Sequence, residues 1–119
     1  RQIAVNLFNR MDANNIKSHV GEFDTTLDTL LPTLETVDLA YLDGNHQKEA
    51  TINYFNWCVE KVNDETIFVF DDIHWSDGMT EAWEVIKAHP KVTSTVDLFF
   101  VGIVFFNTNL SKEDFILKF

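Results

Sequence analysis

Cysteine and positive charge are scarce in this chain, and each scarcity excludes a class of protein. Cys58 is the single cysteine, so neither a disulfide nor a thiolate metal site can form within one chain. The 9 Lys and Arg residues are outnumbered by 19 Asp and Glu residues, which gives a formal net charge of −10. That charge repels the phosphate backbone, so we expect no nucleic-acid partner.

Long apolar runs and common catalytic motifs are also missing. The longest apolar stretch, residues 98–106, is far shorter than the ~20 residues that span a bilayer, and no signal-peptide pattern opens the chain. We expect this Phe-rich stretch to be core or subunit interface. The chain also has no GxGxxG, Walker or GxSxG motif. Because it has neither a membrane-spanning stretch nor a signal pattern, we expect a cytoplasmic protein with no membrane partner.

Apolar residues are plentiful enough to build a core. They make up 45% of the 119 residues, with 11 Phe among them. An apolar helical stripe through Leu7, Phe8 and Met11 begins within a few residues of Arg1. This pattern predicts that the chain starts inside an element of a larger protein, so that residues 1–119 form a single partial domain.

Hydrophobic periodicity predicts alternating helices and strands, and hence a doubly wound, Rossmann-like α/β sheet that ends in an antiparallel hairpin. Residues 111–119 fit either a strand or a short helix. The predicted elements are a helix over 2–12, a strand over 16–20, a helix N-capped by Asp24, a strand over 37–42, a helix over 47–62, a strand over 66–70, a helix capped by Ser76 or Asp77, and strands over 92–98 and 101–106.

Two of these strands stop at carboxylates. Asp43 follows the strand over 37–42, and Asp71 and Asp72 follow the strand over 66–70. Ligands of parallel α/β units sit beyond the carboxyl ends of the strands, so these three side chains are expected at one site. Oxygen donors suit Mg²⁺ or another divalent cation better than zinc, although the same residues equally suit caps and turns.

Two histidines and a tryptophan near these carboxylates each have two possible roles on the sequence alone. His46 or His74 is a candidate general base, because imidazole titrates near neutral pH, and either also fits a loop histidine bonded to the backbone. Trp75 is expected either to form the wall of a pocket or to pack against the strand.

The run Val37–His46, an apolar strand followed by Asp-Gly-x-His, resembles the fourth-strand motif of class I S-adenosylmethionine-dependent methyltransferases. Residues 67–73 resemble their fifth strand, and the resemblance covers essentially the whole chain. It implies strands 3 to 7 of the methyltransferase fold, with residues 16–20 as the third strand and residues 92–106 as the closing hairpin.

The resemblance also implies roles for individual residues. Gly21, Glu22 and Phe23 match the turn beside the adenine of the cofactor, so they are expected to bind S-adenosylmethionine together with Asp43. His46 matches the histidine near the transferred methyl group and is a candidate base, with Asp43 as a second catalytic residue.

In the metal-dependent O-methyltransferases of this family, an Asp and an Asp-Asn pair bind the cation. The matching positions are Asp43, Asp71 and Asp72, and the last departs from Asn to Asp. The glycine-rich cofactor loop of the family would lie upstream of Arg1, so the chain alone is expected to bind S-adenosylmethionine weakly. The unpaired edge of the strand over 37–42 favours a homo-oligomer.

Together these observations predict S-adenosylmethionine-dependent methyl transfer to a hydroxyl of a small molecule or sugar. Two other functions remain open on the sequence alone. One is a metal-dependent hydrolase that uses the same carboxylates, and the other is a non-catalytic α/β assembly module.

Overall fold

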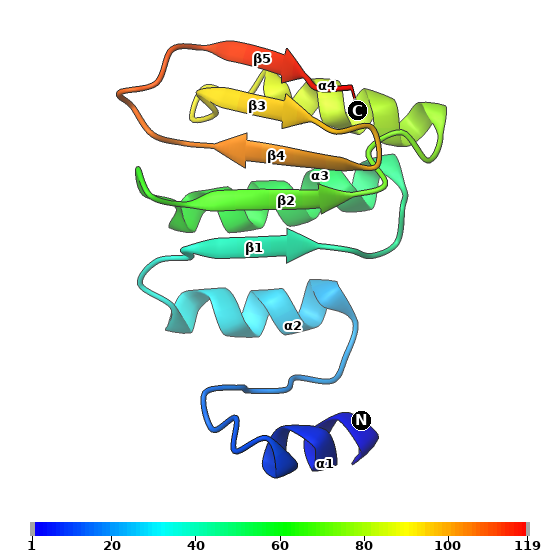
Figure 1. Ribbon diagram of the computed structural model, residues 1–119, viewed down its shortest axis with the longest axis vertical. Coiled ribbons are helices and arrows are strands. Elements are labelled where there is room, and N and C mark those ends of the chain that lie inside the picture. The colour runs from blue at the N-terminus through cyan, green and yellow to red at the C-terminus, as the bar shows by residue number, and fades with distance from the viewer. Residues whose placement is uncertain (1, 119) are drawn as a thin grey trace.

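The computed structural model, which describes residues 2–118, is built around a five-stranded sheet in the order β1-β2-β4-β3-β5 (Figure 1). β1 and β2 are parallel, β4 is antiparallel to both β2 and β3, and β5 is parallel to β3. The helices are α1 (Gln2–Arg10), α2 (Phe23–Leu30), α3 (Lys48–Cys58) and α4 (Asp77–Lys87), with 3₁₀ turns at Leu31–Thr33 and Val59–Lys61. The strands are β1 (Leu39–Leu42), β2 (Ile67–Asp71), β3 (Ser94–Asp97), β4 (Val101–Phe105) and β5 (Glu113–Ile116).

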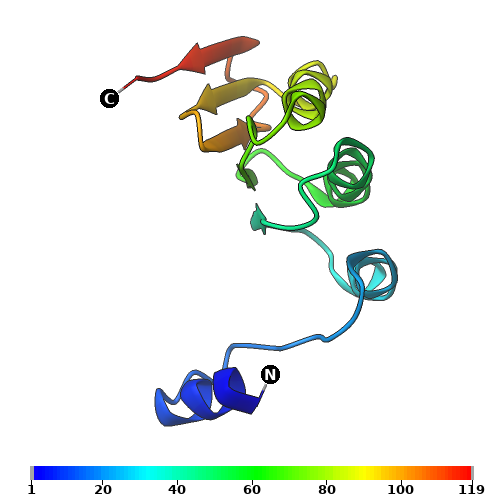
Figure 2. The same cartoon turned by 90° about the vertical axis from the view of Figure 1, so that its right-hand side faces the viewer.

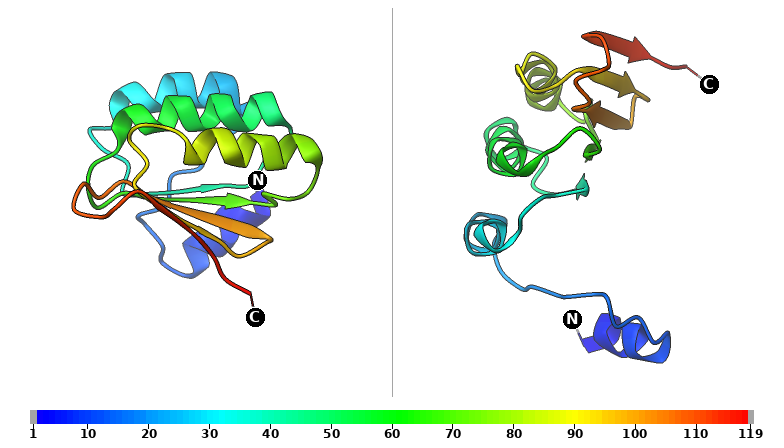
Figure 3. Two further views of the ribbon diagram at one scale, coloured as in Figure 1. Left: turned by 90° about the horizontal axis from the view of Figure 1, so that it is seen from above. Right: turned by 90° about the vertical axis from the view of Figure 1, so that its left-hand side faces the viewer.

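Three helices cover one face of the sheet. Figures 2 and 3 show α2, α3 and α4 side by side on that face, while α1 lies apart, beyond the β1 edge and on the other side of the sheet. The core lies between this helical layer and the strands, where Phe68 and Phe70 of β2 pack against Phe55 of α3 with ring centroids 6.2 Å apart. Alternate strand residues point away from the helices, which is why Leu39 and Tyr41 of β1 stay exposed. No helix in residues 2–118 is long and apolar enough to cross a membrane.

A close contact between α4 and β4 requires glycine. A Cβ at Gly102 would lie 2.7 Å from two ring atoms of Trp83, which is itself fully buried. The missing side chain therefore lets the largest core residue lie directly on the strand.

Most predicted elements are confirmed. Residues 92–98 and 101–106 form the expected antiparallel hairpin as β3 and β4, and the helix expected over 47–62 is α3 followed by a 3₁₀ turn. Ser76 is the N-cap of α4, where its hydroxyl accepts a hydrogen bond from the Met79 N–H at 3.2 Å. The open α/β sheet with a closing antiparallel pair is the architecture that the periodicity indicates.

Two local expectations are wrong. Residues 16–20 form no strand, because within residues 2–118 no other strand pairs with them, and Ile16 and Val20 are exposed. Asp24 is not an N-cap, since α2 begins at Phe23 and its N-cap is Glu22. Asp24 lies in the first turn, where its negative charge still favours the positive end of the helix dipole.

The tail, for which both a strand and a short helix fit the sequence, forms a strand. β5 pairs with β3 in parallel register, with Thr95 opposite Asp114. The Thr95 hydroxyl donates to the Asp114 carboxylate at 2.6 Å, so a side-chain bond reinforces the backbone pairing.

Candidate functional site

The carboxyl ends of β1 and β2 lie next to each other and bring the predicted acids to one edge of the sheet. The two strands are in parallel register, with Leu42 opposite Phe70, so the loops that follow them begin side by side. His46 lies between two of the acids. Its Nε2 is 3.7 Å from Asp43 Oδ1, and its Nδ1 is 3.8 Å from Asp72 Oδ2. The structure thus places one imidazole between two carboxylates that come from different strands.

Tyr41 is a member of this cluster that the sequence reasoning missed. The pKa of its hydroxyl is raised, first by loss of hydration and then by the negative charges of Asp71, Asp43 and Asp72. All three predicted acids therefore act on one phenol at the end of β1. The signal in the sequence was a tyrosine two residues before Asp43, so close to the strand end that it must share the edge.

The loops around the cluster adopt unusual backbone conformations. Asn45, His46, Asp72 and Phe99 all have positive φ, at 61°, 25°, 53° and 71°. Residues other than glycine adopt such angles at a cost, and they persist where the surroundings hold them. The Asp72 N–H donates to the Phe100 carbonyl at 2.6 Å, which joins the loop after β2 to the tip of the β3–β4 hairpin.

The expected metal centre is not supported by the arrangement of the side chains. Among residues 2–118, no group of three or more His, Cys, Asp or Glu residues is placed so that it could hold a metal ion. Asp43 and Asp72 approach opposite nitrogens of the His46 ring. The residues present therefore do not fit the expected divalent cation, and the cluster is a histidine held between acids.

The predicted cofactor-binding turn does come together with the end of β1. A Cβ at Gly44 would lie 2.2 Å from Cε2 of Phe23, so glycine is needed for this contact. The Phe23 ring also meets Tyr54 of α3 edge to face, with centroids 5.3 Å apart. The pocket between these segments is lined by Gly21, Glu22, Phe23, Gly44, Asn45 and Tyr54. Aromatic faces beside a free carboxylate fit an adenosine group, whose base stacks and whose hydroxyls donate.

His74, the other candidate base, has both ring nitrogens engaged. Nε2 lies 2.7 Å from Asp97 Oδ2, and Nδ1 lies 3.1 Å from the Thr80 hydroxyl. Burial raises the pKa of Asp97, but hydrogen bonds from His74 and from the Phe99 N–H outweigh this effect and hold the pKa below its usual value. His74 therefore joins the loop after β2 to α4 and β3, and the geometry does not favour it as a base.

Trp75 is a pocket wall, one of the two roles open to it on the sequence. A cavity of about 180 Å³ is lined by Asp72, His74, Trp75, Phe99 and Phe100. The Trp75 ring centroid lies 5.9 Å from that of His46, so this cavity adjoins the histidine. Phe99 and Phe100 are 61% and 65% exposed, which excludes the core, one of the two places expected for them, and leaves a subunit interface as a prediction.

Comparison with known proteins identifies the family and the fold. A sequence profile of the family described as a methyltransferase domain matches residues 4–73. The chain belongs to this methyltransferase family. The match includes Asp43, His46, Asp71 and Asp72, whereas the aromatic hairpin tip lies outside it.

Among solved structures, this methyltransferase domain resembles an O-methyltransferase from Bacillus cereus in complex with SAH. The TM-score is 0.67 at 19% sequence identity, a likeness that shows the shared fold. The alignment covers 87% of this chain and 57% of that protein, so the chain spans a little over half of its length. No curated protein sequence matches the chain.

Proposed function

We propose that this chain is the C-terminal part of a methyltransferase domain that moves a methyl group from S-adenosylmethionine to a hydroxyl of a small molecule. Family membership and the fold shared with an O-methyltransferase solved with SAH support the transfer. The observation that carries the proposal is His46 placed between Asp43 and Asp72. The neighbouring Asn45 lines the turn pocket, and Asp72 lines the aromatic cavity.

His46 is the general base in this proposal. When bound, S-adenosylmethionine supplies an electrophilic methyl group. His46 accepts the proton of the acceptor hydroxyl as the new C–O bond forms and the C–S bond breaks, with the C–S electron pair left on sulfur. Asp43 and Asp72 orient the ring and stabilise the imidazolium that results. Positioning of the two reactants supplies much of the remaining acceleration.

Gly21, Glu22 and Phe23 form the adenosine side of the cofactor site in this proposal. The Phe23 ring offers a stacking face, and Glu22 offers an acceptor for hydroxyl or amino groups. Residues that precede this chain in the full-length protein are proposed to complete the site, so residues 1–119 alone bind the cofactor weakly. For residues 1–119 taken alone, the exposed apolar residues Leu39 and Tyr41 on the edge strand β1 support a homodimer.

A metal-dependent hydrolase is not favoured, because Asp43, Asp71 and Asp72 are not arranged as a cation site.

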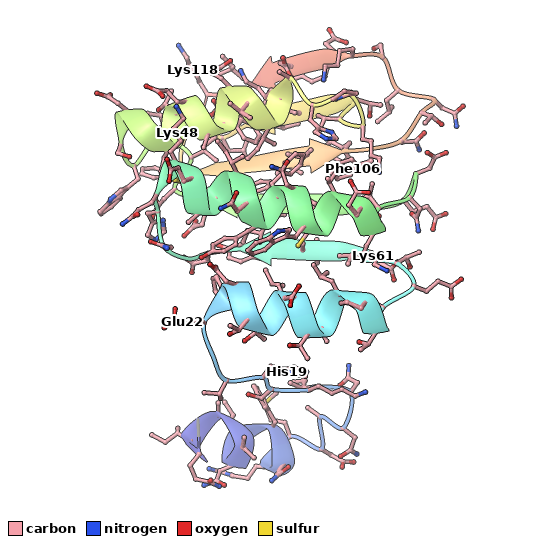
Figure 4. The ribbon with its side chains drawn as sticks, turned by 180° about the vertical axis from the view of Figure 1, so that it is seen from behind. His19, Glu22, Lys48, Lys61, Phe106 and Lys118 are labelled. Carbon is pink, nitrogen blue, oxygen red and sulfur yellow. The ribbon has the colours of Figure 1, made fainter. Side chains whose placement is uncertain are left out.

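The test is His46→Gln in the full-length protein, measured as methyl transfer from labelled S-adenosylmethionine to a panel of hydroxylated small molecules. We expect kcat to fall by about 10²- to 10⁴-fold, as for removal of a general base, while SAH affinity stays the same. The matched control is His19→Gln, since His19 is exposed on the segment between α1 and α2, far from the loops that follow β1 and β2 (Figure 4). Full activity of the His46→Gln variant, or an equal loss in the control, would refute the proposal.

A further inference from the structure

The strand β5 forms the edge of the sheet opposite β1. It pairs with β3 on one side, and within residues 2–118 no strand lies on its other side. Figures 1 and 2 show this edge at the end of the molecule farthest from α1. Phe115, Ile116 and Leu117 follow one another here and are 43%, 70% and 53% exposed. Large apolar residues exposed in a row on an edge strand are typical of a surface that binds another chain.

The backbone of β5 has hydrogen-bonding groups directed at this open edge. The N–H groups of Glu113 and Leu117 donate to carbonyl groups of the segment 93–97, at 3.1 and 2.9 Å. Successive residues of a strand direct their N–H and C=O groups to opposite sides, so every second residue faces away from β3. The residues whose backbone groups face the open edge are therefore Asp114, Ile116 and Lys118.

The usual protections of an edge strand are missing from β5. Edge strands are commonly blunted by a proline or by a bulge that interrupts the ladder. The segment 111–118 contains no proline, and the pairing of β5 with β3 runs without a bulge, from Ser94 opposite Glu113 to Asp97 opposite Ile116. The edge is therefore regular enough to add one more strand.

A second copy of β5 matches this edge in charge. Two copies related by a two-fold axis run antiparallel, and the residue on the axis faces its own copy. With Ile116 on the axis, Asp114 faces Lys118 of the partner subunit, and Phe115 faces Leu117 of the partner subunit. Figure 4 shows Lys118 at this edge of the sheet. Each side of the axis then has one pair of opposite charges and one apolar pair, and both kinds of cross-strand pair are stabilising.

The two neighbouring registers oppose like charges. With Phe115 on the axis, Lys112 faces the partner's Lys118. With Asp114 on the axis, it faces the partner's Asp114. Like charges directly opposite each other destabilise a strand pair, so charge selects the register with Ile116 on the axis.

We infer that β5 is the dimerisation edge of this protein and that it pairs antiparallel with β5 of a second copy, so that two sheets join into one. The inference does not depend on the proposed methyl transfer. Leu117 lines a hollow of about 310 Å³ together with Leu98, Phe99 and Phe100. In the dimer Leu117 packs against Phe115 of the partner subunit, which removes exposed apolar surface from water.

The first test is analytical ultracentrifugation of the full-length protein and of its Lys118→Asp variant. We expect the wild type to form a dimer and Lys118→Asp to weaken it about 4-fold or more, because two pairs of opposite charge become two pairs of like charge. The matched control is Lys17→Asp, which makes the same change of charge on the exposed segment between α1 and α2 (Figure 1). This variant should leave the dissociation constant of the dimer unchanged.

The second test is oxidative cross-linking, which checks the register. Ile116→Cys places two thiols on the axis with Cα atoms about 5.5 Å apart, within the range of about 4.4–6.8 Å that a disulfide spans. Mild oxidation should therefore link the subunits. Glu113→Cys is the control on the same strand, because its two copies would lie roughly 20 Å apart, six residues at about 3.3 Å each, and should not link. Thermal unfolding of each variant checks that it is folded.

Three results would overturn the inference. They are a full-length protein that stays monomeric at its highest soluble concentration, an unchanged dissociation constant in Lys118→Asp, and cross-linking of Glu113→Cys equal to that of Ile116→Cys. Neither experiment measures methyl transfer, so each of these results leaves the proposed function standing.

Discussion

The contact between Asp97 and His74 allows a direct test of how the site loops are held. Asp97 is only 9% exposed at the end of β3, and its carboxylate accepts from His74 and from the Phe99 N–H, each at 2.7 Å. Asp97→Asn keeps an oxygen for Phe99 and removes the charge. Asp97→Ala removes both acceptors and leaves two donors without partners.

The two variants should differ in cost. A hydrogen bond to a charged group contributes about 1.5–3 kcal/mol, compared with about 0.5–1.5 kcal/mol for a neutral bond. We therefore expect Asp97→Asn to lower the free energy of unfolding by about 1–2 kcal/mol at neutral pH. Asp97→Ala should lower it by about 3 kcal/mol or more, since both donors stay desolvated. Each kcal/mol corresponds to roughly 3–5 °C in Tm for a chain of this size.

The pH dependence of the free energy of unfolding tests this account of the Asp97–His74 contact. Because the pKa of Asp97 is lowered in the folded state from its usual 3.8, its stabilising effect is fully present above that value and is lost as the pH falls through the folded pKa. Urea unfolding of the wild type and Asp97→Asn should therefore show a gap at neutral pH that closes on acidification. A gap that is absent at neutral pH, or that widens in acid, would refute this account of the contact.

Two further predictions concern close packing and burial. Gly44→Ala should destabilise the fold by about 1–3 kcal/mol in urea unfolding, because its Cβ would lie 2.2 Å from the neighbouring phenylalanine ring. Gly78→Ala in α4, with its nearest contact at 3.5 Å, should instead add about 0.5–1 kcal/mol, and equal stabilities would contradict the packing. Cys58 is buried and its pKa is raised to about 11, so a thiol reagent at neutral pH should modify it only after unfolding. Rapid modification of the native protein would show that the thiol is accessible.

The sequence predicts elements well where both the helix and its partner strand lie within the chain. The buried stripe of α3 includes Phe55 and Cys58, which repeat with the helical period because they meet Phe68 and Phe70 on β2. Residues 16–20 have a comparable apolar pattern but form no strand. A local apolar pattern indicates which residues are buried, but it does not indicate whether another strand is present to pair with the backbone.

In the candidate site, too, the sequence predicts what depends on strand order and misses what depends on loop conformation. Parallel strands alone predict that Asp43, Asp71 and Asp72 lie at one edge of the sheet, and in the structure the loops that follow β1 and β2 begin side by side. The prediction of a divalent cation is not supported. The directions of these side chains depend on the loop with positive φ at Asn45 and His46, which puts His46 between Asp43 and Asp72. The partner of His74 is 23 residues away in sequence, so only the folded hairpin could identify it.

The tip of the β3–β4 hairpin and the loop after β2 are separate segments of the chain, joined by the hydrogen bond from the Asp72 N–H to the Phe100 carbonyl. That bond does not depend on which side chain residue 100 carries. Substitutions at the tip can therefore change the aromatic lining of the cavity beside Trp75 while the backbone link to the loop that carries Asp72 is kept.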